Sequence, residues 1–290
     1  MRLARAAGLG QLGLGTIDGR KVRANTSRHQ AMSPGRMVAE EARLERECAA
    51  ILGQMEAVNA AEDAAHGEDD DGSGGLPAEL QNRERRLAKL RAVRAQLEAE
   101  RGARLEPQPQ KRCADPDAQL MRTGDGALPY ASHAQAAVSA DGFVGASGLT
   151  TAVRDTGQLV PRGAAVAANP GEPPQGVIAD KGYLTEDNLA TLRTPGQRGL
   201  LGVGREGKVP VRWPQGRETQ RMPRLLRLPW ARRLYARRQT QAERPNAEMK
   251  WAMGCRRFTL RGIAKVRGEW DLVCAAFNLR RLRALAGACG

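Results

Sequence analysis

This sequence has few aromatic residues and no long apolar run. Only ten of its 290 residues are Phe, Tyr or Trp, so a buried core has to consist mainly of Leu, Val, Ala and Ile. No stretch of about eighteen apolar residues occurs, which argues against a membrane-spanning helix. Glycines interrupt the apolar residues of segment 1–15, so it does not resemble a secretory signal. The length suits one large domain or two small ones with a real core.

Cysteine and histidine are also scarce. The chain contains no Cys-x-x-Cys pair and no Cys/His spacing typical of zinc, although it has five cysteines: Cys48, Cys113, Cys255, Cys274 and Cys289. This favours free thiols in a reducing cytosol. His29, His66 and His133 show neither triad spacing nor metal-ligand spacing, so the sequence assigns them no role.

Acidic residues are few in one part of the chain only. Residues 201–290 carry 21 Lys and Arg against 6 Asp and Glu, whereas residues 1–200 are nearly balanced, with 25 against 26. The net charge of +14 therefore comes from the last ninety residues. A basic surface of this size favours a polyanionic partner, most often nucleic acid. No clean apolar face accompanies the arginines, so a membrane surface is disfavoured. A merely arginine-rich chain remains the alternative explanation.

Local patterns predict a mixed α/β fold. A loop rich in glycine and acids, 67–77, separates two heptad-like seams within 36–104, which predicts an antiparallel helical hairpin. Thr185 is a candidate helix cap. The expected strands are 12–25, two within 133–150 joined at 140–142, 176–179 and 199–204; the expected helices are 154–161, 185–194, 231–253 and 262–286; a linker is expected at 106–129 and irregular structure at 208–230.

The two seams of the hairpin consist of regularly spaced apolar residues. They are Leu44, Cys48, Ile51, Met55 and Val58, followed after the loop by Leu80, Leu87, Leu90 and Leu97. Three adjacent acids in the loop, 69–71, could bind a metal, but such runs are usually just solvated. The expected organisation is a first-strand region, 1–35, an inserted hairpin, 36–105, and the remainder of an α/β core, 106–290.

Three acids occupy positions that suggest a metal site. Asp18 and Asp180 are each expected at the end of a strand, and Glu243 lies on an arginine-rich helix. Carboxylates gathered from strand ends and a helix can hold two Mg²⁺ ions that clamp a phosphodiester. The alternative is that each acid begins a solvated loop or lies on a solvated helix face.

Several blocks, in order, resemble the DDE-type transposases of bacterial insertion sequences, in the IS-four/IS-five-like superfamily with a helical insertion after the first catalytic strand. The blocks are IDGRKVRANTSRHQAMSPGRM (17–37), EDAAHG with LPAEL and RERRLAKLRAVRAQLEAE (62–100), CADPDAQLM and HAQAAV (113–121, 133–138), IADKGYLTEDNL (178–189), and YARRQTQAERPNAEMKWAMGCRRFTLRGIAKVRGEW with FNLRRL (235–270, 277–282). Together they span most of residues 10–285.

The resemblance implies an RNase H-like fold and a metal-binding catalytic triad of Asp18, Asp180 and Glu243. It also implies Mg²⁺ or Mn²⁺, two ions, as cofactor, and cleavage and strand transfer of DNA in which water and then a freed 3′-hydroxyl attack in line. The implied DNA-binding residues are Tyr235, Arg238 and Lys250 of a Tyr–Arg–Glu–Lys signature, with Arg237, Arg256 and Arg257. The implied partners are double-stranded DNA and a second copy of the chain, in the bacterial cytoplasm at the nucleoid.

The sequence departs from the family pattern at several places. Arg20 replaces the usual Thr after Asp-Gly, and Pro245 follows Glu243 where a helix interior is expected. Gly182 is expected to allow a sharp backbone turn, and Tyr183 is expected to pack. The family's upstream DNA-binding region is expected to be missing, as in a truncated gene. Two other functions therefore stay open: a non-catalytic DNA-binding relic, and a partner-binding protein acting through the hairpin.

Overall fold

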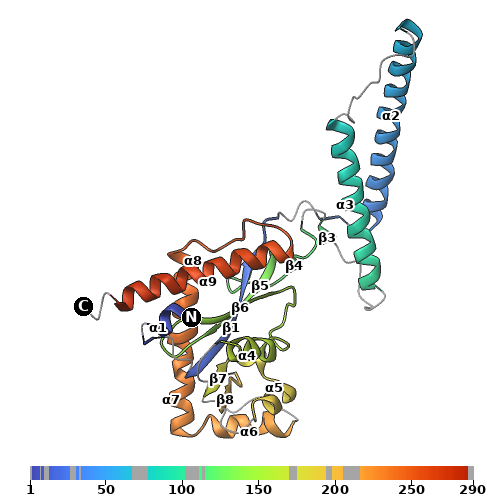
Figure 1. Cartoon of the computed structure of the whole chain (residues 1–290). Helices are drawn as coiled ribbons and strands as arrows, with labels where there is room; N and C mark the ends of the chain where they lie inside the picture. The colour runs from blue at the N-terminus through green and yellow to red at the C-terminus, as the bar shows by residue number, and fades with distance from the viewer. Residues whose placement is uncertain are drawn as a thin grey trace. The chain divides into compact units, whose positions relative to one another are not determined.

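The computed structural model describes most of the chain. The described residues are 2–6, 8–9, 13–26, 31–32, 34–66, 78–101, 111–112, 115–169, 175–193, 198–204 and 216–286. Two compact units are present: a core unit, residues 1–25 and 117–290, and a hairpin unit, residues 26–116 (Figure 1). His29, Cys113, Cys289 and the acidic run 69–71 lie outside the described residues, as does the side chain of His66.

A mixed sheet forms the centre of the core unit (Figure 1). Its strands are β1 (Leu14–Arg23), β4 (Gln119–Leu120), β5 (Tyr130–Val138), β6 (Val144–Thr150), β7 (Gly176–Ala179) and β8 (Arg198–Leu201). The order is β4-β5-β1-β7-β8, with β6 paired to β5. β5 runs antiparallel to β1, whereas β7 and β8 run parallel to β1. This arrangement is compatible with an RNase H-like fold, so the predicted fold class is confirmed.

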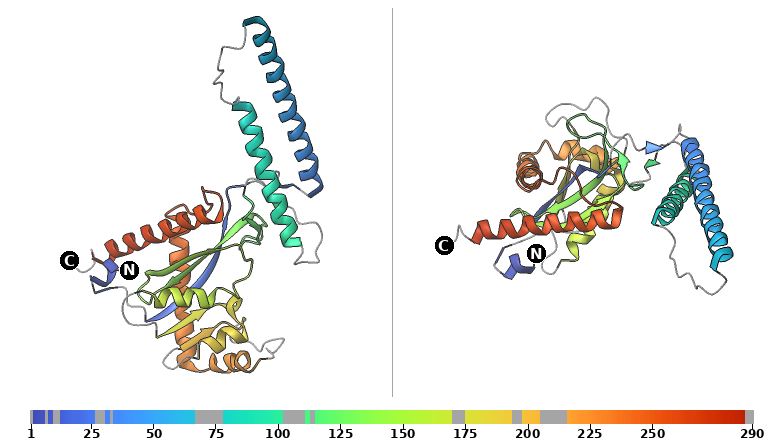
Figure 2. Two further views of the ribbon diagram at one scale, coloured as in Figure 1. Left: turned by 45° about the vertical axis from the view of Figure 1, so that its right-hand side comes forward. Right: turned by 90° about the horizontal axis from the view of Figure 1, so that it is seen from above.

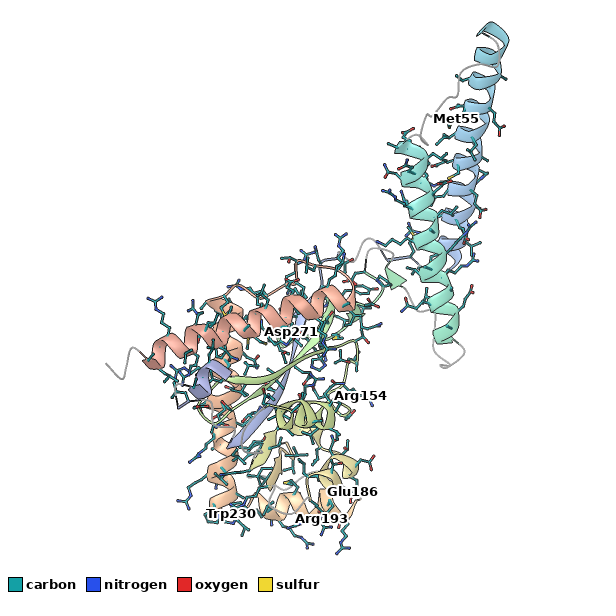
Figure 3. All side chains as sticks on the ribbon, viewed as in Figure 1. Met55, Arg154, Glu186, Arg193, Trp230 and Asp271 are labelled. Atoms are coloured by element: carbon teal, nitrogen blue, oxygen red, sulfur yellow. The ribbon has the colours of Figure 1, made fainter. Side chains whose placement is uncertain are left out.

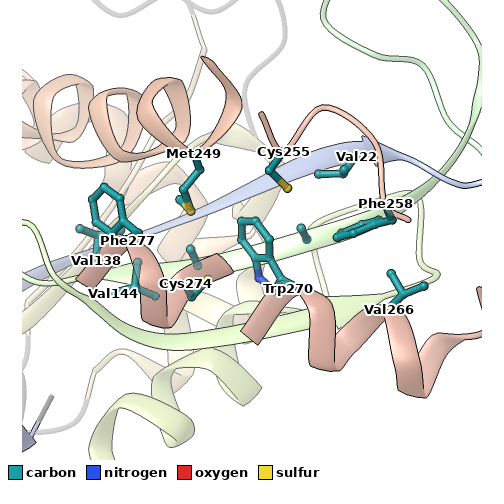
Figure 4. Packing of buried hydrophobic residues seen from close by; sticks show 12 residues of the cluster. Val22, Val138, Val144, Met249, Cys255, Phe258, Val266, Trp270, Cys274 and Phe277 are labelled. Atoms are coloured by element: carbon teal, nitrogen blue, oxygen red, sulfur yellow. The ribbon is translucent and has the colours of Figure 1, made fainter. Parts of the chain in front are cut away.

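Helices cover both faces of the sheet (Figure 2). One face packs on α4 (Leu159–Ala167), α5 (Glu186–Thr191) and α6 (Arg217–Leu225) through a cluster that includes Ile17, Val177 and Tyr183. The other face packs on α7 (Pro229–Arg238), α8 (Arg244–Trp251) and α9 (Ile263–Ala286). Figure 4 shows the second cluster, where Trp270 of α9 lies among apolar side chains and donates through Nε1 to the Gln135 carbonyl at 3.0 Å. A short helix, α1 (Arg2–Ala6), precedes β1.

Side chains of β1 alternate between the two faces of the sheet and pack against the helices on both sides. Ile17 belongs to the cluster under α4 and α5, whereas Val22 belongs to the cluster under α9. Successive side chains of a strand point to opposite faces, so residues of even number in β1 share the face of α7, α8 and α9. Asp18 therefore lies on the face covered by the arginine-rich helices.

The hairpin unit contains the two predicted helices, α2 (Pro34–His66) and α3 (Ala78–Arg101), and a small sheet of β2 (Ala31–Met32) and β3 (Lys111–Arg112). Its buried cluster consists of Met37, Leu44, Leu87, Leu90, Val93 and Leu97. Glutamates of α2 pair with arginines of α3, for example Glu41 with Arg91 at 3.0 Å. Val58 is exposed, so the predicted seam ends before it. The reason is length, since α3 has 24 residues and α2 has 33.

Three other sequence expectations were wrong. The helix expected at 154–161 begins only at Leu159 and runs to Ala167 as α4. The linker expected at 106–129 contains β3 and β4, and the irregular stretch expected at 208–230 contains α6. Helix α6 is amphipathic: it buries Thr219 and Met222 against the core, and its arginines lie on the exposed side. The proline that suggested irregular structure, Pro223, lies only two residues before the last residue of α6. The hairpin turn at 140–142 and the Thr185 cap, which accepts from the Asn188 N–H at 3.2 Å, are confirmed.

Candidate active site

Asp18 and Asp180 lie side by side at the end of the parallel pairing between β1 and β7. Ile17 pairs with Ala179, and the next residue of each strand is one of the two aspartates. Asp180 directly follows β7, as predicted, whereas Asp18 is in the middle of β1 and not at its end. β1 continues to Arg23 because residues 16–23 also pair with the longer strand β5. The sheet thus brings together two acids that are 162 positions apart in the sequence.

The two carboxyl groups repel each other in a largely buried place. Burial, and then the charge of Asp180, raise the pKa of Asp18 from the ordinary 3.8 to about 6. Burial also raises the pKa of Asp180, although the Gly182 N–H donates to its Oδ1 at 2.8 Å and opposes the shift. The guanidinium of Arg238 lowers both pKa values and does not cancel the rise. The site therefore has an excess of negative charge that a divalent cation would relieve.

The helical segment after α7 approaches Asp18 through one amide. Asn246 of α8 donates through Nδ2 to Asp18 Oδ2 at 2.7 Å. Arg20 donates to the main-chain carbonyls of Asn246 at 3.1 Å and of Cys255 at 2.7 Å. Arg20 is thus used to hold α8 and the loop after it against β1. It is not a free cation beside the acids.

Glu243 ends a π-helical turn, η3 (Gln239–Glu243), between α7 and α8. The turn follows from Pro245, which has no N–H to bond to the carbonyl four residues earlier. Pro245 occupies the first turn of α8, where a proline is tolerated. The side chain of Glu243 is exposed, three residues before Asn246. Among the described residues, no three Asp, Glu, His or Cys side chains are gathered closely enough to hold a metal, so Glu243 remains a prediction.

The predicted DNA-binding residues lie on or just after the same helical segment. Arg238 stacks 5.8 Å from the centre of the Tyr235 ring, which places the two residues on one helix face, and its buried Nε has no hydrogen-bond partner. Lys250 and Arg256 lie over the exposed Trp251 ring at 4.8 and 4.0 Å. Arg257 donates a hydrogen bond to the main-chain carbonyl of Ala24 at 3.2 Å. Arg237 is exposed.

A polar cluster beneath the two aspartates, buried except for the partly exposed Asp155, was missed by the sequence analysis. It consists of His133, Gln135, Asp155 and Tyr183. His133 had been assigned no role, and Tyr183 had been expected only to pack. One signal was available: His133 and Gln135 are two residues apart in a predicted strand and so share a face. Nothing in the sequence placed Asp155, which is on the loop between β6 and α4.

Gly182 has a different role from the one predicted. It is not among the glycines with positive φ, so the turn η2 (Lys181–Tyr183) does not require glycine for its backbone angles. A Cβ at this position would lie 2.9 Å from Asp155 Oδ2 and 3.0 Å from Asp180 Oδ1. Glycine is therefore needed here for close approach of two carboxylates.

The core unit therefore combines a sheet compatible with an RNase H-like fold, two adjacent aspartates and an arginine-rich helix. Residues 205–283 match the model of the family described as "Transposase DDE domain". The matched segment contains Tyr235, Arg238 and Glu243 and excludes Asp18 and Asp180. No curated protein and no solved structure matches the chain. In the described part, no helix has the length and apolar character to cross a membrane.

Proposed function

We propose that this protein is a metal-dependent DNA transposase that cleaves DNA at insertion-sequence ends and joins it to a target. The observation that carries the proposal is the placement of Asp18 beside Asp180, with a pKa for Asp18 of about 6. Perturbed pairs of this kind are typical of catalytic sites. The match to the transposase family over the basic helices supports the choice of DNA as substrate.

The residues present fit one or two divalent ions, Mg²⁺ or Mn²⁺. Asp18 and Asp180 offer hard carboxylate oxygens, the ligands that Mg²⁺ prefers, and they lack a full counter-charge. Glu243 is the proposed third ligand. When bound, such ions stabilise the attacking and leaving oxygens of a phosphodiester. The chain itself contributes Asn246, which orients Asp18, and Arg238, whose charge faces both aspartates.

The test uses cleavage of a supercoiled plasmid that carries the DNA flanking the gene, with Mg²⁺ or Mn²⁺. Asp180→Asn and Glu243→Gln should each abolish metal-dependent cleavage. Glu248→Gln is a matched control, because Glu248 lies on α8, five residues after Glu243, and pairs with Arg280 at 3.1 Å. Unchanged cleavage in Asp180→Asn would refute the catalytic proposal.

We also propose that duplex DNA lies along α6 and α7, which both carry exposed arginines. Arg217, Arg221 and Arg224 form one stripe of α6 at four- and three-residue spacing. Replacing all three by Gln should reduce the slope of log K against log salt by about 2.7, if each contacts one phosphate. The control removes three exposed cations elsewhere in the core unit: Arg122, Lys265 and Arg283. Equal slopes in the two variants would exclude this surface.

The runner-up function is DNA binding without cleavage, as in a transposase relic. It is favoured by one observation, the exposed side chain of Glu243, which is not gathered with the aspartates in the described structure. A relic would bind DNA with the same salt dependence and would cleave nothing with Mg²⁺ or Mn²⁺.

For the active enzyme we propose that two copies of the chain act on paired DNA ends. Light scattering of the protein–DNA complex would give the number of copies.

A further inference from the structure

The carboxylate of Asp155 lies directly behind the two candidate catalytic acids. Its Oδ1 lies so close to Gly19 that a Cβ at that position would overlap it, and its Oδ2 is 2.9 Å from the position of a Cβ on Gly182. Gly19 follows Asp18 in β1, and Gly182 lies two residues after Asp180. Each oxygen of Asp155 therefore touches the backbone that carries one of the two aspartates.

Asp155 is held by two buried side chains of β5. His133 Nε2 lies 3.0 Å from Asp155 Oδ1, and Gln135 donates to the same oxygen through Nε2 at 2.8 Å. His133 Nδ1 lies 3.0 Å from the Ala152 carbonyl, which can only accept. Each ring nitrogen therefore lies within hydrogen-bond distance of an oxygen atom. His133 is only 1% exposed, so the contact with Asp155 is shielded from solvent on the histidine side.

Further hydrogen bonds connect the His133–Asp155 pair to the turn that carries Asp180. The Tyr183 hydroxyl donates to Gln135 Oε1, and Tyr183 is fully buried. Asn188 donates through Nδ2 to the carbonyls of Thr156 at 2.8 Å and of Tyr183 at 2.7 Å. The loop of Asp155, strand β5 and turn η2 are therefore joined by buried hydrogen bonds, which rigidify when all members are satisfied.

We propose that Asp155 is a positioning residue for the divalent-cation site, held in place by His133. It fixes the backbone of β1 and of η2 at the two glycines, and it adds a negative charge behind Asp18 and Asp180. Asp155 is not itself a ligand in this proposal, because His133 and Gln135 already engage its Oδ1 and its Oδ2 lies against Gly182. The inference rests on the proposed function only in assuming that the two aspartates bind the cation.

The main test measures Mn²⁺ binding by calorimetry on the full-length protein at pH 7.5, without DNA. Asp155→Asn keeps the shape and an acceptor for Gln135 but removes the charge. Loss of a supporting residue around a metal site typically weakens affinity about 10- to 100-fold, and that loss is expected here. Asp271→Asn is the control, since Asp271 also accepts one hydrogen bond, from Ser147 at 2.6 Å, outside the cluster (Figure 3). Mn²⁺ affinity within twofold of wild type in a folded Asp155→Asn protein would overturn the proposal.

A second measurement separates this inference from the proposed function. In the metal-free protein, the effects of Asp155→Asn and Asp18→Asn on the unfolding midpoint should be non-additive. The reason is that either substitution alone already removes the repulsion between the two carboxylates. If wild type binds no Mn²⁺, the proposed function fails. In that case, additive changes in the unfolding midpoint of the two substitutions would overturn the placement of Asp155 as well. If wild type binds Mn²⁺ but cleaves no DNA, the affinity comparison still decides the role of Asp155.

Discussion

Replacing Asp18 by Asn should stabilise the metal-free protein. In the folded state burial and Asp180 raise the pKa of Asp18 from 3.8 to about 6, so the charged form is disfavoured by folding. Asn has the same shape and can still accept the hydrogen bond from Asn246 Nδ2. The substitution therefore removes an unfavourable charge without removing a contact. The charged carboxylate of Asp18 thus lowers the stability of the metal-free fold, as functional sites often do, and a bound cation would remove this penalty.

The size of the effect follows from the pKa. The difference between about 6 and 3.8 corresponds to about 3 kcal/mol above pH 7, at 1.36 kcal/mol per pH unit, and is an upper limit. For a unit of this size, 2 kcal/mol raises the unfolding midpoint by about 4 to 8 °C. Since the pKa is raised on folding, wild type is fully free of the penalty below pH 3.8 and bears it in full above about pH 6. The advantage of Asp18→Asn should therefore vanish near pH 4.

Tryptophan fluorescence is the suitable assay, because all four tryptophans, Trp213, Trp230, Trp251 and Trp270, belong to the core unit. Thermal unfolding of wild type and Asp18→Asn would be compared from pH 4 to 8 in EDTA, and again with Mn²⁺. We expect Mn²⁺ to raise the midpoint of wild type and to leave the variant unchanged. A variant less stable than wild type at pH 8 would refute the reasoning, as would an advantage that does not depend on pH.

Three further substitutions test the packing of each unit. Gly19→Ala should destabilise the core unit by about 1 to 3 kcal/mol, because its Cβ would overlap three fixed polar atoms. The matched control is Gly268→Ala, at an exposed position of α9 where a Cβ meets no other atom. It should stabilise the core unit by about 0.5 to 1 kcal/mol. Leu44→Ala should destabilise the hairpin unit by about 2 to 5 kcal/mol, seen by far-ultraviolet circular dichroism, and leave the tryptophan transition unchanged. Thr185→Ala should lower core stability by about 1 kcal/mol through loss of the helix cap, whereas an unchanged midpoint would show that water replaces the cap.

Much of the fold could be predicted from local patterns. The heptad-like seams gave the hairpin, and the apolar run before Asp180 gave β7. Composition misled at α6, where arginine and proline suggested irregular structure and the helical spacing of the arginines was overlooked. Pairing also lengthened β1 beyond Asp18, because the partner strand β5 continues along it.

The candidate site was only partly predictable. Asp18 and Asp180 came from the sequence, since each follows an apolar stretch in a recognisable block. The contact of Asn246 with Asp18 did not, because it depends on the π-helical turn that Pro245 imposes on the helix axis. Glu243 was predicted from the family pattern, and its place near a cation stays a prediction.

The sequence by itself determined most of the helices and strands, where the positive charge is concentrated, and which acids are candidates. Such properties depend on spacing and composition over a few residues, so they can be read without coordinates. Only the tertiary structure placed Asp18 beside Asp180 and brought Asp155 behind them on a buried histidine. Those contacts join residues far apart in the chain, and they arise from strand register and close approach at two glycines, which no local pattern encodes.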